Sequence, residues 1–287
     1  MKRVLFLISE WGYWGCELLE PLRACDDAGY ESTFVTPTGG RPTPLSASAD
    51  SAYVDPPLGR APTDEETAAA VRALDASERV ADPISLSGWF PERPYPSSPR
   101  YLRELEVYHE RAARIVEEEL AAYDALVLVG GSGAMVDLVN DQRVHELVRG
   151  FAGADKPVVA QSQAVATLLF ARDPDAGHGL VQGRHVTGPP LVYDRTSGTI
   201  LEGLRVPGST RTGAGQGAID VGPTFYPLEH LLRDAVGPEG QYIGRVGHRT
   251  CVLVDHPFVT SRCSAGAAEC GRAIVEVLER GLRRSGW

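Results

Sequence analysis

Residues 3–36 contain a complete β-α-β unit, and this unit constrains the fold more than any other part of the sequence. Residues 3–9 are almost continuously apolar, as expected for a strand that is covered on both faces. Residues 16–28 carry their leucines on one helical face and are followed by Gly29, a common helix stop. Residues 31–36 form a second strand, which ends at Pro37. Strands joined by a crossover helix run parallel, so the sequence predicts an α/β fold with a mostly parallel sheet.

The rest of the chain alternates between apolar runs and amphipathic stretches, except for one segment. Residues 41–100 are rich in Pro, Ser and Asp, with one helical stretch at residues 63–76. We interpret them as a cap-like insertion that folds over the sheet, within a single domain that covers residues 1–287. Further elements are expected at residues 101–123 (helix), 125–129 (strand), 142–152 (helix), 157–160 (strand), 178–188 (β-hairpin), 208–217 (Gly-rich loop), 228–236 (helix), 249–254 (strand) and 267–283 (helix).

Composition excludes several classes of partner. The formal net charge is −10 and no Lys/Arg cluster is present, which argues against a nucleic-acid or anionic-membrane surface. No run of 18 or more apolar residues exists, so no transmembrane helix is expected. The five cysteines include no CxxC pair, which is typical of reduced thiols in the cytoplasm. No acidic or histidine cluster has metal-ligand spacing, so no metal is predicted. We also expect a small-molecule substrate and no cofactor.

Residues 156–171, KPVVAQSQAVATLLFA, have the layout of a nucleophile elbow: a strand, a tight turn and a helix. Ser162 occupies the tip. Ala160 and Ala164 are small enough for the backbone to turn sharply on either side of it. The turn would hold Ser162 at the carboxyl edge of a parallel sheet, where open α/β sheets bind their ligands.

Four parts of the chain, spread over most of its length, resemble the ThiJ/PfpI superfamily. They are WGYWGCELLEP with AGYESTFVTPTGGRP, DPISL, YDALVLVGGSGAMVDL and KPVVAQSQAVATLL, and CVLVDHPFVTSRCSAGA is a fifth, weaker match. The layout is most similar to the larger glyoxalase III and chaperone-like branch. The resemblance implies a flavodoxin-like three-layer sandwich, shared with class I glutamine amidotransferase domains. Family members are commonly dimers, so it also makes a homodimer one option.

Family chemistry uses a cysteine at the elbow, commonly followed by a histidine, with a glutamate after the first strand. Carried over by position, the glutamate is Glu17, while Ser162 replaces the cysteine and Gln163 replaces the histidine. A serine hydroxyl is a weak nucleophile unless a base removes its proton, and the adjacent base is missing. Glyoxalase chemistry through a thiohemiacetal is therefore not expected at Ser162.

Three functions stay open on the sequence alone. In the leading hypothesis Glu17 is a general acid/base, Ser162 and Gln163 bind a polar or conjugated electrophile, and the backbone of Gly131 and Ser132 completes an oxyanion site. The reaction would be a cofactor-free hydration, elimination or isomerisation, similar to isonitrile hydratases and other lyases of the family. The second hypothesis is a serine hydrolase, with a base supplied by His185, His230 or His256. The third is a family member that lost catalysis and serves as a binding or chaperone-like protein.

Three other side chains are candidates for contact with substrate. Cys16 directly precedes Glu17 and is either a relocated thiol or a packed small hydrophobe. Trp14 belongs to an aromatic group with residues 89 and 90 of the insertion, which would either wall a pocket or pack the insertion against the body. His185 is the histidine that we include in the substrate-binding set. The remaining cysteines are expected to be inert.

Overall fold

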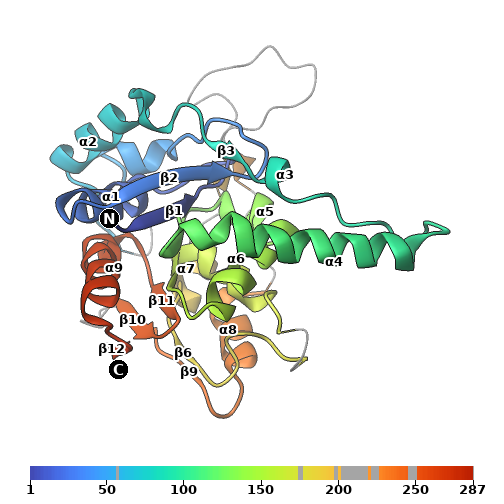
Figure 1. Ribbon diagram of the computed structural model, residues 1–287. Helices are drawn as coiled ribbons and strands as arrows, with labels where there is room; N and C mark the ends of the chain where they lie inside the picture. Colours follow the sequence, from blue (N-terminus) through green and yellow to red (C-terminus); the bar gives the residue numbers. More distant parts are fainter. Residues whose placement is uncertain are drawn as a thin grey trace.

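A mostly parallel sheet forms the centre of the protein, in the strand order β12-β10-β11-β5-β4-β1-β2-β3 (Figure 1). The computed structural model describes residues 1–55, 58–173, 177–196, 200–201, 219–220, 226–244 and 251–286. The strands are β1 (Arg3–Leu7), β2 (Glu31–Thr36), β3 (Ile84–Ser85), β4 (Ala125–Leu128), β5 (Val158–Gln161), β10 (Val252–Asp255), β11 (Phe258–Ser261) and β12 (Arg284–Ser285). The strands β11, β5, β4, β1, β2 and β3 each pair in parallel with their neighbours in this order. Strand β10 is antiparallel to both β11 and β12. The predicted α/β class is therefore confirmed.

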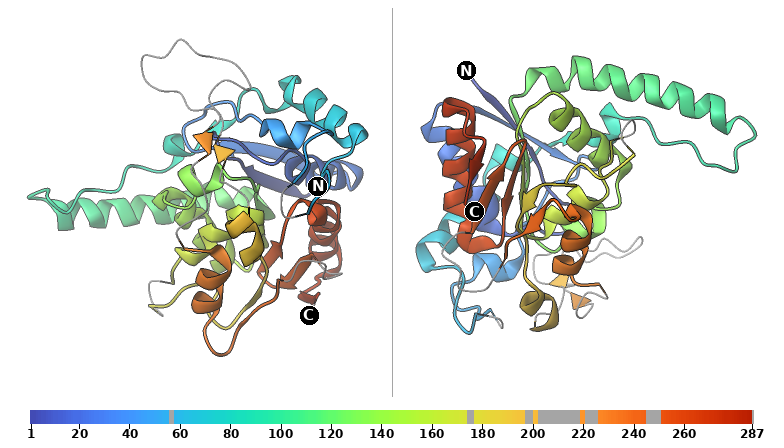
Figure 2. Two further views of the ribbon diagram at one scale, coloured as in Figure 1. Left: turned by 180° about the vertical axis from the view of Figure 1, so that it is seen from behind. Right: turned by 90° about the horizontal axis from the view of Figure 1, so that it is seen from below.

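Helices cover both faces of this sheet, which gives the three-layer sandwich that the sequence predicts (Figure 2). On one face, α1 (Gly15–Asp27) packs with α9 (Ala267–Arg280) over Val4 and Phe6. On the other face, α6 (Gln142–Gly153) and α8 (Leu228–Val236) pack over Leu5 and Leu7. Successive residues of β1 thus enter two different cores, which explains why the strand is apolar throughout.

Residues 41–100 contribute to the sheet as well as covering part of it. This segment contains η1 (Ser46–Ala49), α2 (Glu65–Asp75), η2 (Glu78–Val80), β3 and α3 (Leu86–Trp89). Ile84 of β3 pairs with Val35, so the segment supplies the edge strand beyond β2. Asp64 caps α2 by accepting a 2.8 Å hydrogen bond from the Thr67 amide. The cap-like interpretation is therefore incomplete, because it leaves out the edge strand β3. A two-residue strand is too short for its period to be visible in the sequence.

Two other predicted elements differ from the structure. The β-hairpin at residues 178–188 was wrong: β6 (His185–Val186) pairs in parallel with β9 (Gln241–Tyr242), far away in the sequence. The elbow helix is a 3-10 helix, η4 (Ser162–Leu169). The Gly-rich loop at 208–217 lies outside the described residues. The other elements are α4 (Tyr101–Glu118), η3 (Leu120–Ala122), α5 (Ala134–Asp137), α7 (Leu191–Thr196), β7 (Ile200–Leu201), β8 (Ile219–Asp220) and η5 (Ser264–Gly266).

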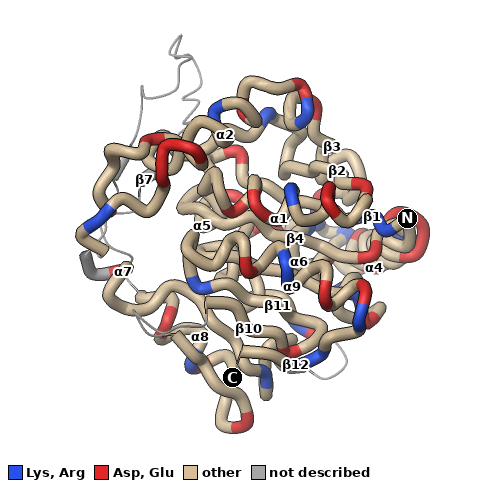
Figure 3. The backbone as a smooth tube through the Cα atoms, turned by 90° about the vertical axis from the view of Figure 1, so that its left-hand side faces the viewer, with Lys and Arg blue, Asp and Glu red and all other residues tan. Residues whose placement is uncertain are grey.

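Charged residues are dispersed over the outer elements. In the view of Figure 3, the Lys and Arg positions alternate with Asp and Glu positions and form no basic face. Helix α4 extends beyond the sheet as an arm (Figure 1). Within the part of the chain that the structure describes, no helix is both long and apolar enough to cross a membrane.

Candidate active site

Ser162 has the strained backbone that a nucleophile elbow requires. Its φ is +49°, and Ser162 and Asp155 are the non-glycine residues with positive φ in the described ranges. The left-handed region is costly for a residue with a Cβ and clusters at functional sites. The strain arises because β5 ends at Gln161 and η4 begins at the next residue. The Ser162 side chain is buried, and its Oγ donates a 2.6 Å hydrogen bond to Oε1 of Gln163.

Glu17 lies in the first turn of α1 and is 1% exposed. Its Oε2 has no hydrogen-bond partner among the described residues. Burial raises the pKa of the Glu17 carboxyl well above its usual range, and the charge of Cys263 raises it further. A helix N-terminus favours a charged carboxylate, but complete desolvation is the larger effect here. Burial therefore favours the neutral carboxylic acid, the form whose proton can be given to a bound molecule.

Glu17 is held beside the elbow by a hydrogen bond to its main chain and by close packing against Gly130. The Gln161 side chain donates from Nε2 to the Glu17 carbonyl oxygen at 2.7 Å. A Cβ built on Gly130 would overlap Glu17 Oε2 and would lie 2.5 Å from the Gln161 carbonyl oxygen. Only glycine fits at that position, because the carboxyl and the end of β5 approach the backbone so closely. The Glu17 carboxyl thus lies beside the strand residue that precedes Ser162.

The glycine-rich turn after β4 packs against the start of α1. Gly131 has a φ of +126°, and a Cβ there would lie 2.6 Å from the Trp14 amide nitrogen. That amide donates to the Gly130 carbonyl at 2.8 Å. Ser132 follows and is 8% exposed. The structure therefore brings Gly131, Ser132 and Trp14 to the same sheet edge as the elbow.

Cys16 and the aromatic residues have packing roles. The Cys16 Sγ donates to the Ser264 carbonyl oxygen at 3.7 Å, and burial raises the pKa of this thiol well above its usual range. Such a thiol is a poor source of thiolate. Trp14 contacts Tyr53 edge-on, at 6.3 Å between ring centroids. Trp89 packs on Tyr123, and Phe90 is 1% exposed within the core, so these two join the insertion to the body.

None of the three histidines named for a serine hydrolase is placed at Ser162. The His185 amide donates to Oδ2 of Asp255 at 2.8 Å, and its ring nitrogen Nδ1 lies 3.4 Å from the same oxygen. Asp255 pairs with Phe258 at the amino end of β11, opposite to the elbow. The His256 ring contacts the main chain of Asp155, before β5 begins, and His230 is exposed on α8. His185 is therefore not brought together with Ser162 and Glu17.

Cys263 is the residue at this edge that sequence reasoning missed. Strand β11 pairs with β5 so that Ser261 lies beside Gln161, and Cys263 follows two residues later. A hydrogen bond from the Cys251 thiol lowers the pKa of Cys263 to about 6, against the effect of burial; the Ala265 amide and Arg262 act in the same direction. The rule that parallel strands share a carboxyl edge could have indicated this residue.

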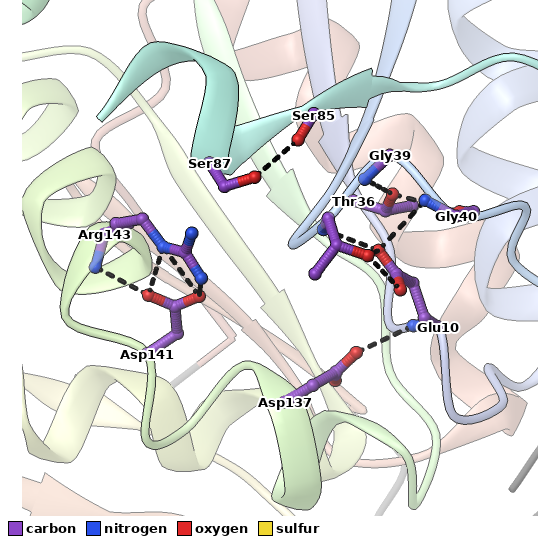
Figure 4. Close-up of polar contacts among 10 residues, drawn as sticks. Glu10, Thr36, Gly39, Gly40, Ser85, Ser87, Asp137, Asp141 and Arg143 are labelled. Atoms are coloured by element: carbon purple, nitrogen blue, oxygen red, sulfur yellow. Dashed lines mark hydrogen bonds and ion pairs between the residues drawn. The ribbon is translucent and has the colours of Figure 1, made fainter. Parts of the chain in front are cut away.

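Two carboxylates after β1 and β4 hold loops in place (Figure 4). Glu10 accepts hydrogen bonds from the Thr38 amide at 2.6 Å and from the Gly40 amide at 3.2 Å. Asp137 accepts from the Glu10 amide at 2.8 Å. Burial raises the pKa of Asp137 to about 6, although hydrogen bonds from Ser9 and Glu10 lower it. Both carboxylates are engaged with the chain, so we assign them a structural role.

Comparison with known proteins agrees with this fold. A family model described as "ThiJ/PfpI family-like" matches residues 8–206. Glyoxalase III from Candida albicans has a similar structure, with a TM-score of 0.60, 14% identity, and coverage of 97% of this chain and 98% of that one. The Rapid Encystment Protein 24 kDa of Francisella tularensis has a TM-score of 0.55 and 17% identity, over 97% and 99% of the two chains.

A ThiJ/PfpI domain protein from Brachyspira murdochii is also similar, with a TM-score of 0.54, 15% identity, and coverage of 98% and 97%. No curated protein sequence matches the chain. At these identities, the likeness to solved structures establishes the fold.

Proposed function

Since the chain belongs to the ThiJ/PfpI-like family, we propose that it is a cofactor-independent enzyme of the hydratase, lyase or isomerase type. Its substrate is a small to mid-sized polar or conjugated electrophile. The observation that carries this proposal is the Glu17 carboxyl, which is buried, has Oε2 without a partner in the described chain, and lies beside the elbow. One of the similar structures is that of an enzyme, glyoxalase III, and this likeness supports a catalytic role.

Glu17 acts as the general acid/base in this proposal. The neutral carboxyl donates a proton to the atom of the substrate that gains electron density, and the carboxylate formed then takes a proton back. A carboxyl whose pKa is raised toward the working pH is suited to both steps, and such catalysis contributes about 10²–10⁴-fold in rate.

Ser162 and Gln163 orient the same substrate atom. Both residues begin η4, whose first amide groups have no partner within the helix. These amides and the backbone of Gly131 and Ser132 would stabilise negative charge that develops on an oxygen or nitrogen. The Ser162 hydroxyl already donates to Gln163, so it is a binding group in this proposal and not a nucleophile.

The test is turnover by the Glu17→Gln variant. Wild type is incubated in D₂O with crotonaldehyde, cyclohexyl isonitrile and dimethyl maleate, which probe two hydrations and an isomerisation, and products are followed by NMR. We expect turnover of at least one probe, with a loss of about 10²-fold or more in Glu17→Gln.

The matched control is Glu20→Gln, one turn later on α1. Glu20 is partly exposed and pairs with Arg23 at 2.8 Å, so its loss should leave turnover unchanged. Wild-type turnover in both Glu17→Gln and Ser162→Ala would exclude the enzymatic hypothesis for this site. A binding or chaperone-like function would then be the better explanation.

A further inference from the structure

We propose that Cys263 is the nucleophilic thiol of this site, and that it adds reversibly to a conjugated carbonyl compound and so catalyses cis–trans isomerisation of its double bond. The inference rests on the proposed function for the site and for the role of Glu17. It narrows the reaction type to an isomerisation and moves the nucleophile from the elbow to the neighbouring strand end.

Strand register brings the end of β11, two residues before Cys263, beside the elbow strand. Ser261 pairs with Gln161, so the chain leaves β11 beside the point where it leaves β5. Cys263 begins the turn into η5 and is partly exposed, unlike Cys25 and Cys270, which are completely buried. A reactive cysteine needs such access.

Hydrogen bonds favour the thiolate form of Cys263. Arg262 donates from Nη2 to the Cys251 Sγ at 2.9 Å, and the Cys251 thiol in turn donates to Cys263. The Tyr193 hydroxyl is also hydrogen-bonded to Cys263. A guanidinium and a phenol therefore flank the hydrogen-bonded Cys251–Cys263 pair and stabilise negative charge on it, with Cys263 the more exposed of the two thiols.

The start of α1, which carries Glu17, packs against the turn that contains this sulfur. Cys16 donates to the carbonyl oxygen of Ser264, the residue after Cys263, which fixes the start of α1 against the turn. Glu17 follows Cys16, and Cys263 is the charged neighbour that acts on its pKa. Glu17, which is 1% exposed and whose Oε2 has no partner in the described chain, is thus an acid on which the proposed thiolate acts electrostatically.

The reaction uses these two groups and no oxidant. The Cys263 Sγ lone pair forms a bond to the β-carbon of the conjugated carbonyl, and the electrons of the C=C bond move toward the carbonyl oxygen. That oxygen takes the proton of Glu17, which gives an enol and a carboxylate. Rotation follows about the bond between the α- and β-carbons, which was the double bond of the substrate and is a single bond in this adduct. Return of the proton to Glu17 and expulsion of the thiolate restore the double bond as the other geometric isomer.

Alkylation by iodoacetamide tests the thiol by itself. The rate is measured between pH 5 and 9, and labelled cysteines are located by mass spectrometry. The groups that face Cys263 are Arg262, Cys251, Tyr193, Glu17, Cys16 and, beyond Cys251, Glu269. We expect Cys263 to be labelled first, with an inflection near pH 6 that moves upward in Cys251→Ala, which lacks the donor thiol.

Isomerisation of dimethyl maleate to dimethyl fumarate tests the reaction. Cys263→Ser should lose about 10²-fold or more in rate, because a hydroxyl there is a much weaker nucleophile. Glu17→Gln should also lose isomerisation but keep the rapid alkylation of Cys263. A Cys263→Ser variant that isomerises at the wild-type rate, or preferential alkylation of another cysteine, would overturn this inference. Neither result affects the proposed function, which fails only if Glu17→Gln and Ser162→Ala both retain wild-type turnover.

Discussion

At the scale of single residues, Ser162 shows a conflict between backbone and side chain. The residue lies in the left-handed region at φ +49°, which glycine adopts without steric strain, yet it carries a hydroxyl that donates to Gln163. A strained conformation of this kind costs on the order of 1–3 kcal/mol and persists only where the surroundings enforce it. Here β5 and the first turn of η4 are both buried, and they hold the residue between them.

This conflict predicts different effects for two small substitutions. Ser162→Ala keeps the strain and loses the hydrogen bond, so the free energy of unfolding should fall by about 1 kcal/mol. Ser162→Gly loses the same bond but relieves the strain, so it should be about 1 kcal/mol more stable than Ser162→Ala. Urea denaturation of both variants measures the difference. Equal stability of the two variants would show that the backbone at Ser162 is relaxed.

At the scale of elements, the packing of α1 on α2 depends on a missing side chain. A Cβ on Gly15 would lie 2.7 Å from Cγ2 of Val71 and 3.1 Å from Oγ of Ser48. The Gly15 amide also donates to the Ser48 hydroxyl at 2.9 Å, so the first turn of α1 is fixed against the insertion. Since Glu17 is two residues further along, this contact helps to position the proposed acid.

Gly15→Ala should therefore destabilise the protein by about 1–3 kcal/mol through overpacking, despite the better helix propensity of alanine. Val71→Ala opens the space, so the double variant should be less destabilised than the sum of the single variants, with a coupling of about 1–2 kcal/mol. Gly153→Ala is the control, because a Cβ there meets no atom within 4 Å. Additive losses in chemical denaturation would contradict the packing argument.

The elements also show what the sequence can and cannot reveal. Strand β2 and helix α8 were predicted to the residue, because strong periodicity and clear stop signals define their ends. Strand β3 and the pairing of β6 with β9 were not predicted, because two-residue strands show no period and their partner strands are remote in the sequence. Glu17 and Ser162 could be located by position within a known pattern. Cys263 was missed, although the shared carboxyl edge of parallel strands offered a signal, because its position depends on the register between β11 and β5.

At the scale of the whole molecule, buried carboxyls make stability depend on pH in an unusual direction. Burial raises the pKa values of both Glu17 and Asp137, so the folded state binds these protons more tightly than the unfolded chain does. The stabilisation is complete below the unfolded pKa values and is lost as the pH rises through the folded ones. For Asp137 this window runs from 3.8 to about 6.

Asp137→Asn tests this dependence, because the amide oxygen can still accept the hydrogen bond from the Glu10 amide while carrying no charge. In the wild type, ionisation of Asp137 should cost on the order of 3 kcal/mol between pH 4 and pH 7, if about 1.4 kcal/mol is taken per pKa unit. The variant should therefore gain stability relative to wild type as the pH rises from 4 to 7, with little difference at pH 4. Urea denaturation at several pH values measures the gain. A constant difference between the two proteins would mean that Asp137 titrates alike in the folded and unfolded states. The burial of its carboxyl against the loop that follows β1 would then contribute nothing to the pH profile of the fold.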